Sequence, residues 1–176
     1  STNHADLVGH LRKSLNQFIA IADEHDIRLA IEPVSFSPFH SLSLAVALIK
    51  DCGSKRLGLV LDTWHLWTSG TSWDEVSTLE PSLIACAHLG DCRPRAGRIW
   101  SDADRTALPG NGVVPLREAV AAIRATGFSG PWTVEVLGET QFISEPAVLA
   151  CAMRNHALSL LNPCLGLANN HAPSKT

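Results

Sequence analysis

The chain has 176 residues, of which 45% are apolar and 18% charged, and its formal net charge is −3. This length suffices for one domain with a sizeable core, and the composition excludes a disordered tail, a collagen-like repeat and a coiled coil. No apolar run reaches the roughly 18 residues of a membrane span, and no N-terminal segment resembles a signal peptide. The net charge is slightly negative, so the composition shows no excess of Lys and Arg of the kind that binds nucleic acid. The five cysteines form no C-x-x-C pair, so we expect a reducing, cytoplasmic setting.

Helices and apolar strands are predicted to alternate along the chain. Apolar residues spaced three and four apart predict helices over residues 7–22, 41–52, 73–79, 115–126 and 145–161. Short apolar runs predict strands over residues 28–33, 57–62, 83–88 and 132–136. A long loop rich in Arg, Asp, Gly and Pro is predicted over residues 90–114, after the third strand. We expect residues 1–161 to form one unit and residues 162–176 to be a loosely ordered tail.

This order of elements predicts an α/β fold. Strands that are apolar throughout and alternate with helices form parallel sheets covered by helices. A closed (β/α)8 TIM-barrel needs about 250 residues, whereas only four βα units are present here. The chain is therefore either a half barrel, with parallel strands and outer helices, or a small open sheet.

All four predicted strands end on or near a side chain that can bind a metal ion. These residues are Glu32, Asp62, His88 and Glu135. In parallel α/β folds, functional sites form at the carboxyl ends of the strands, so we expect the four side chains to converge. Three carboxylates and one imidazole suit Mn²⁺, Mg²⁺ or Co²⁺ and admit Zn²⁺. The sequence thus predicts a site for one divalent metal ion.

Several short motifs occur in a specific order along the chain. They are Ile31-Glu32-Pro33, Leu61-Asp62-Thr63-Trp64-His65, Ala87-His88-Leu89-Gly90-Asp91, Leu108-Pro109-Gly110-Asn111-Gly112, Gly127-Phe128-Ser129-Gly130 and Val134-Glu135-Val136. As a set, they resemble the C-terminal half of the sugar phosphate isomerase/epimerase superfamily, the xylose-isomerase-like TIM barrels. The resemblance covers about residues 5–161 and favours half a barrel over an open sheet.

The resemblance implies a role for several residues. Glu32, Asp62, His88 and Glu135 match the metal ligands of the family, and in its epimerases the carboxylates at the first and last of these positions also form the acid/base pair. His65 resembles the family histidine that hydrogen-bonds a substrate oxygen. Arg93 is the candidate for holding a substrate hydroxyl or phosphate. The family places its arginine one position later, where this chain has proline, and Arg95 is therefore a rival.

We accordingly expect a metal-dependent isomerase or epimerase that acts on a small sugar, sugar phosphate or polyol. Such an enzyme removes a proton next to a carbonyl and passes through an enediolate. An alternative is the apurinic-site endonuclease family, which shares the fold. Its members carry a further D-x-H, whereas residues 101–105 of this loop contain no histidine.

A second alternative is a non-catalytic half-barrel fragment or assembly module. Four strands leave two open sheet edges, which favour association. The first half of the family's barrel is not in the sequence, so we expect either a longer parent chain or a homo-oligomer, for which a C2 dimer of two halves is one route. Expected partners are a small-molecule sugar or polyol, with neither nucleic acid nor membrane.

Overall fold

The computed structural model describes residues 4–94, 97, 100–138 and 145–162. Its centre is a four-stranded sheet in the order β1-β2-β3-β4, in which every neighbouring pair is parallel. The strands are β1 (Leu29–Ile31), β2 (Leu57–Asp62), β3 (Ile84–Leu89) and β4 (Trp132–Val134). The α/β fold with four parallel strands of a partial barrel is thus confirmed, with strand boundaries shifted by one or two residues at some ends.

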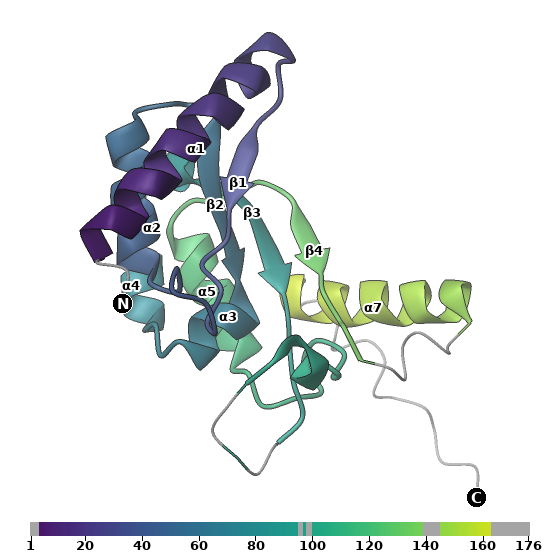
Figure 1. Ribbon diagram of the computed structural model, residues 1–176. Helices are drawn as coiled ribbons and strands as arrows, with labels where there is room; N and C mark the ends of the chain where they lie inside the picture. The colour runs from purple at the N-terminus through teal and green to yellow at the C-terminus, as the bar shows by residue number, and fades with distance from the viewer. Residues whose placement is uncertain (1–3, 95–96, 98–99, 139–144, 163–176) are drawn as a thin grey trace, which may run out of the picture.

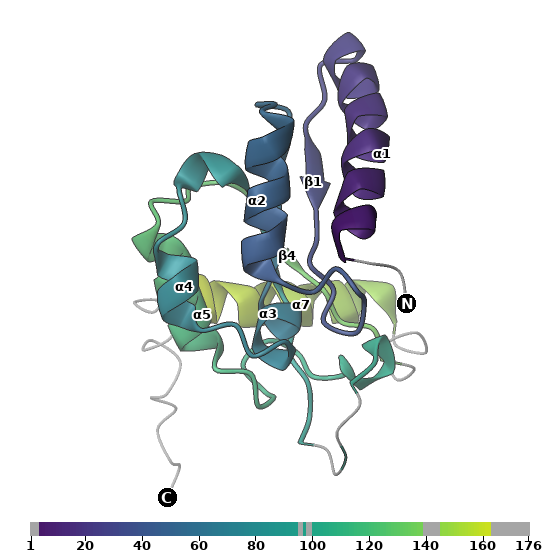
Figure 2. The ribbon, with the colours of Figure 1, turned by 60° about the vertical axis from the view of Figure 1, so that its left-hand side comes forward.

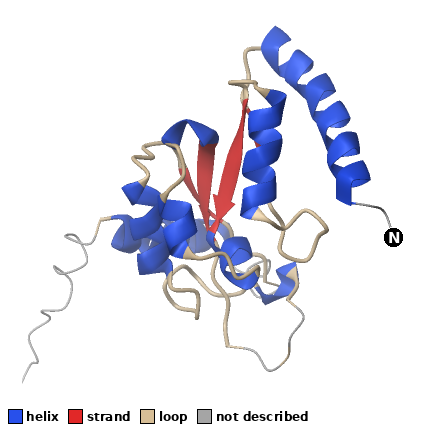
Figure 3. Cartoon of the chain, turned by 90° about the vertical axis from the view of Figure 1, so that its left-hand side faces the viewer, coloured by secondary structure: helices blue, strands red, loops and turns tan. Residues whose placement is uncertain are grey.

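Helices pack beside this sheet (Figure 1). They are α1 (His4–Glu24), α2 (Leu42–Cys52), α3 (Thr63–Thr68), α4 (Trp73–Ser77), α5 (Leu116–Ala125) and α7 (Pro146–Leu161). Two short 3-10 turns, η1 (Pro81–Leu83) and η2 (Asp102–Asp104), complete the described elements. In Figure 2, α1 and α2 run alongside β1, and Figure 3 shows the strands with helices to either side. None of the helices of the described part of the chain is long and apolar enough to cross a membrane.

The main core lies between the sheet and these helices. Leu59 and Leu61 of β2 are fully buried and share one apolar cluster with Ala45 and Ile49 of α2. Burial of each such leucine side chain contributes about 1.5–3 kcal/mol. The α2 helix begins where the hydroxyl of Ser41 accepts a hydrogen bond from the Leu44 N–H. This cap and the buried side of α2 together hold the helix against β2.

Helix α3 was not expected from the sequence. Asp62, the last residue of β2, accepts hydrogen bonds through Oδ1 from the N–H groups of Trp64 and His65 at 2.9 Å each. This side chain therefore caps a six-residue helix directly after the strand. Such a helix is too short to show periodicity in the sequence. The predicted helix over residues 73–79 is also shorter, because α4 ends at Ser77.

Because the strands are parallel, their carboxyl ends all point to one end of the sheet. Helix α3, η2 and the loop that follows β3 gather there (Figure 1). The described elements end with α7 at Leu161. The predicted tail lies outside the described residues except for Asn162.

Candidate functional site

The structure brings the four predicted metal ligands together. Glu32, Asp62, His88 and Glu135 each offer one ligand atom, and these four atoms lie within 4.8 Å of one another. Nδ1 of His88 lies 2.9 Å from Glu135 Oε2, 3.8 Å from Glu32 Oε1 and 3.9 Å from Asp62 Oδ2. Glu32 directly follows β1 and Glu135 directly follows β4, so the cluster joins all four strand ends.

One atom of the cluster has an unmet bonding requirement. Oε1 of Glu32 is buried and has no hydrogen-bond partner among the described residues. A buried carboxylate oxygen without a partner costs free energy unless a cation or a proton satisfies it. Three carboxylates and an imidazole are also the donor set that a divalent ion accepts. The residues present therefore fit a divalent metal ion.

The two glutamates of the cluster have opposite electrostatic environments. Burial, together with the charges of Asp62 and Glu135, raises the pKa of Glu32 to about 7. The hydrogen bond from His88 lowers the pKa of Glu135 to about 2, and that same hydrogen bond raises the pKa of His88. Two carboxyl groups whose pKa values are driven apart are suited to separate acid and base roles.

The structure adds a residue that the sequence analysis missed, Arg105. Its Nη2 lies 2.5 Å from Asp62 Oδ2 and 3.1 Å from Glu135 Oε2, so one nitrogen bridges ligands from β2 and β4. Its Nη1 lies 3.3 Å from His65 Nε2 and 3.6 Å from Asp102 Oδ1. The side chain is only 1% exposed. A buried guanidinium that contacts two carboxylates of the cluster belongs to the site rather than to the solvated surface.

The surroundings of Arg105 hold its guanidinium in place. The guanidinium lies 5.2 Å from the ring centroid of Trp64, within the range of a cation–π interaction. A Cβ atom on Gly90 would stand 2.9 Å from Arg105 Nη2, so this position requires glycine for the close approach. The Arg105 carbonyl also accepts a hydrogen bond from the Leu137 N–H at 2.8 Å. Backbone and side chain are thus both fixed beside β4.

Asp91 organises the loop that delivers Arg105. Its side chain is completely buried, and the residue forms an isolated antiparallel bridge with Ala107. Its two carboxylate oxygens accept backbone N–H hydrogen bonds at 2.8–3.1 Å from Cys92, Gly110, Gly112 and Val114. The carboxylate therefore closes the loop onto itself, and Arg105 lies within the closed segment.

The predicted substrate-binding residues have different locations. His65 lies beside the cluster but is only 3% exposed, and burial lowers its pKa. Arg93 is exposed, and no contact joins it to the cluster in the described part of the chain. Arg95 lies outside the described residues. Within the described residues, the arginine that contacts the cluster is Arg105.

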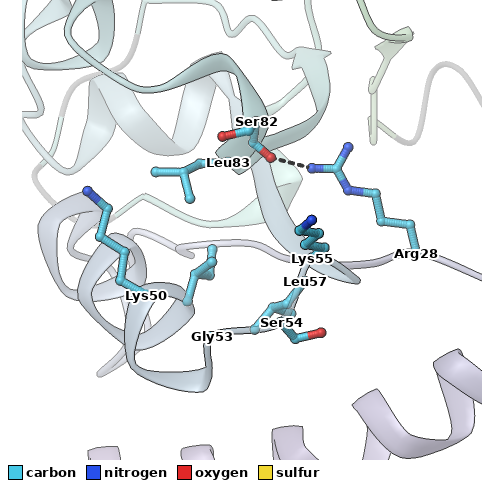
Figure 4. Close-up of a pocket in the computed structure, with 9 residues that line it drawn as sticks. Arg28, Lys50, Gly53, Ser54, Lys55, Leu57, Ser82 and Leu83 are labelled. Atoms are coloured by element: carbon cyan, nitrogen blue, oxygen red, sulfur yellow. Dashed lines mark hydrogen bonds between the residues drawn. The ribbon is translucent and has the colours of Figure 1, made fainter.

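A cavity at the opposite end of the strands differs in character from this site. It has a volume of about 550 Å³, and Arg28, Lys50 and Lys55 lie at its edge (Figure 4). Arg28 donates a hydrogen bond to the Ser82 carbonyl at 2.8 Å, which Figure 4 marks. The lining residues include no carboxylate or histidine. The cavity therefore lacks the carboxylate and imidazole groups that form the cluster at the other end.

Four parallel strands whose carboxyl ends hold a Glu-Asp-His-Glu cluster, a group that could hold a divalent ion, define a barrel-type α/β protein. The chain belongs to the xylose isomerase-like TIM barrel family, whose sequence model matches residues 2–154. It is similar to the inosose isomerase of Halalkalibacterium halodurans, with 24% identity over 124 residues, and to the D-psicose 3-epimerase of Agrobacterium fabrum, with 25% identity over 131 residues.

The solved structures that resemble the chain support the same fold. The crystal structure of the IOLI protein with a binding zinc atom superposes with a TM-score of 0.84 at 19% identity, covering 90% of this chain and 58% of that one. The alignments to the inosose isomerase and the epimerase cover 69% and 73% of this chain, but only 44% and 41% of those proteins. The matched part of the chain thus corresponds to less than half of either enzyme.

Proposed function

We propose that this chain carries the metal and acid/base half of a divalent-metal-dependent sugar or polyol isomerase or epimerase. The observation that carries the proposal is the convergence of four ligand atoms within 4.8 Å at the ends of four parallel strands. The similarity to an inosose isomerase and a D-psicose 3-epimerase supports a ketone or ketose substrate. We further propose a cytoplasmic enzyme that uses Mn²⁺, Mg²⁺ or Co²⁺, with Zn²⁺ as the remaining option.

In this proposal, Glu32, Asp62, His88 and Glu135 hold the metal ion. A bound divalent ion supplies Lewis-acid stabilisation of negative charge on a substrate oxygen, an effect of several kcal/mol. The family match of the strand-end motifs supports a second role for the two glutamates as the acid/base pair. Without a bound ion, burial and the neighbouring charges of Asp62 and Glu135 raise the pKa of Glu32 to about 7.

The two glutamates come from the outermost strands of the sheet, β1 and β4. Carboxylates on opposite sides of a substrate can remove a proton from one face of a carbon and return it to the other, which is epimerisation. Return of the proton to a neighbouring carbon is isomerisation. Arg105 supplies a fixed positive charge next to Asp62 and Glu135. The exposed Arg93 stays the proposed contact to a substrate hydroxyl or phosphate.

Calorimetric titration with Mn²⁺ tests the metal site directly. We expect one ion per chain with a micromolar or lower Kd, and no binding by the double variant Glu135→Ala, His88→Ala. The variant Glu80→Gln is the matched control, because its carboxylate is exposed and paired with Lys50 away from the cluster. Binding that persists in the double variant would refute the site.

A substrate screen then tests the reaction. Incubation of the Mn²⁺-loaded protein with D-psicose, D-fructose and inosose in deuterated water measures incorporation of deuterium at the carbon next to the carbonyl. We expect exchange in the wild type and its loss in Glu32→Gln. A protein that binds metal but exchanges no proton in any of these compounds would contradict the isomerase proposal while leaving the metal site intact.

A further inference from the structure

Both ring nitrogens of His88 have a partner in the structure. Nδ1 faces the carboxylates of the cluster, and its shortest contact is the 2.9 Å hydrogen bond to Glu135 Oε2. Nε2, on the other edge of the ring, lies 3.8 Å from Sγ of Cys86, within the range of a hydrogen bond that involves sulfur. Within the described part of the chain, this thiol is the hydrogen-bond partner of Nε2. The imidazole therefore lies between the cluster and a cysteine.

Strand β3 places the thiol and the imidazole on one face of the sheet. Cys86 and His88 are two residues apart, and alternate residues of a strand point to the same face. In the register with β2, His88 is opposite Asp62 and Cys86 is opposite Val60. Both side chains are partly exposed, whereas Ala87 between them is fully buried. The thiol thus lies one step closer to the amino end of β3 than the cluster does.

A metal ion at the cluster would decide which ring nitrogen of His88 carries the proton. A neutral imidazole has one N–H donor and one nitrogen with a lone pair. Because Nδ1 faces the carboxylates, an ion held there takes the lone pair of Nδ1, and the proton is then on Nε2. This N–H points to Cys86 Sγ. Histidines that bind a metal almost always donate their second ring N–H to an acceptor that orients the ring.

A thiol also suits the state without an ion. In that state, Nδ1 of His88 donates to Glu135, and a neutral ring then has its lone pair on Nε2. A thiol is both a weak donor and a weak acceptor, so Cys86 can pair with Nε2 in either state. A carboxylate or a carbonyl group could only accept, and an aliphatic side chain could do neither. The residue type at position 86 therefore fits a histidine that exchanges a proton for an ion.

We propose that Cys86 is a positioning residue of the metal site: its sulfur accepts the Nε2–H of His88 and holds the imidazole with the Nδ1 lone pair toward the ion. The thiol contacts His88 and acts on the ion through the imidazole. Without this acceptor, Nε2–H loses its partner and the ring is less firmly oriented, so the affinity for the ion falls. This assignment rests on the proposed metal site.

Calorimetric titration with Co²⁺ tests the effect on affinity. Cys86→Val removes the acceptor and leaves less room for a replacement water than alanine would. We expect it to raise the Kd for Co²⁺ about three- to tenfold, with partial recovery in Cys86→Ser, which retains a donor and an acceptor. Cys52→Val is the matched control, because it replaces another partly exposed thiol, at the end of α2, and it should leave the Kd unchanged.

Nitrogen-15 NMR of the histidine rings tests the pair independently of affinity. In Zn²⁺-loaded protein labelled on histidine, we expect the ring proton of His88 on Nε2. In Cys86→Val the Nε2 signal should shift both with and without Zn²⁺, and in the loaded protein the proton should exchange faster with solvent. In Cys86→Ser the signal should lie closer to that of the wild type.

Three results would overturn the proposal. One is an equal Co²⁺ affinity of the wild type and Cys86→Val, and another is a His88 Nε2 signal that Cys86→Val does not shift. The third is a thiolate-to-Co²⁺ charge-transfer band that disappears in Cys86→Val, because Cys86 would then be a ligand. A wild-type protein that binds no divalent ion would refute the proposed function and the role of Cys86 with it. That result is distinct from the other three, because it requires no comparison between variants.

Discussion

Two arginines of this protein each lie close to a glycine, at opposite ends of the sheet. Arg28 lies beside Gly58 of β2, and Arg105 lies beside Gly90, which follows β3. Near the amino ends, Arg28 Nη2 lies 2.9 Å from where a Cβ atom of Gly58 would stand. Near the carboxyl ends, Arg105 Nη2 has the same 2.9 Å separation from a Cβ atom on Gly90. Arg28 is exposed and donates to a carbonyl oxygen, whereas Arg105 is 1% exposed and contacts two carboxylates.

The difference shows that burial, rather than residue type, decides what an arginine does here. An exposed guanidinium remains hydrated and can leave its position at little cost. A buried guanidinium is retained only because its charge is paired, and its removal leaves partner carboxylates buried without a counter-ion. At the carboxyl end of the sheet, the buried charges of Arg105 and its partner carboxylates therefore depend on one another. At the amino end, Arg28 is a solvent-exposed side chain whose charge does not depend on a buried partner.

Replacement of each arginine by methionine should separate the two ends most clearly. Arg105→Met should lower the free energy of unfolding by about 3–5 kcal/mol, because Asp62 then remains buried without its partner. Arg28→Met should lower it by about 1 kcal/mol or less, the effect of one hydrogen bond to a carbonyl. Urea denaturation monitored by tryptophan fluorescence measures both. Equal losses in the two variants would contradict the comparison.

Alanine at the two glycines should give a smaller difference of the same kind. A Cβ atom at Gly90 meets Arg105 and, at 3.0 Å, the Cβ of Trp64, both of which are buried. We expect Gly90→Ala to destabilise the fold by about 2–3 kcal/mol and to weaken Mn²⁺ binding. Gly58→Ala should destabilise the fold by about 1–3 kcal/mol, because its Cβ meets Ala85 Cβ at 3.0 Å and the Leu83 carbonyl oxygen at 3.1 Å, and it should leave Mn²⁺ binding unchanged. Unfolding and calorimetry on both variants distinguish a steric effect from an effect on the cluster.

The carboxyl end should also be the one where removal of a charge stabilises the fold. The pKa of Glu32 is about 7 in the folded chain against 4.5 ordinarily, so folding binds its proton and stability falls as the pH rises from about 4.5 to 7. Glu32→Gln should therefore raise the unfolding free energy of the metal-free protein by about 1–3 kcal/mol at pH 8. Glu80→Gln, at an exposed ion pair, should change it by less than about 1 kcal/mol. A destabilised Glu32→Gln protein would show that the cluster is not strained.

The sequence was sufficient to predict the positions that converge. Parallel strands share one direction, so their carboxyl ends lie at the same end of the sheet. Each strand end can be located from its own apolar run, and the convergence of Glu32, Asp62, His88 and Glu135 could therefore be predicted without knowing the course of the loops. The family motifs added the choice of a barrel over an open sheet. Helix α3 was missed because a single capping side chain, rather than a periodic pattern, starts it.

Arg105 could not be found in this way. It lies 17 positions after His88 in a loop whose course depends on the buried carboxylate of Asp91 and its four backbone N–H partners. No periodic pattern encodes such a course, and counting positions from His88 pointed to Arg93 and Arg95 instead. The sequence did contain one signal for Arg105, the LPGNG motif that follows it. Backbone N–H groups of this motif bind Asp91, which follows β3, and the loop between them is thereby brought back to the ends of the strands.

The last prediction concerns the pH dependence of metal binding, which depends on the protonation of the cluster. The metal ion requires an ionised Glu32 and a neutral His88, whereas burial raises the pKa of Glu32 to about 7 and the hydrogen bond to Glu135 raises that of His88. Binding must therefore release protons, and the affinity for Mn²⁺ should increase by up to about tenfold per pH unit for each proton released as the pH rises from 6 to 8. Calorimetry in buffers of different ionisation enthalpy counts these protons, and Lys50→Gln, at the amino end, should leave the count unchanged. An affinity independent of pH would mean that the ion binds without Glu32 and His88, and the two ends of the sheet would then differ in burial alone.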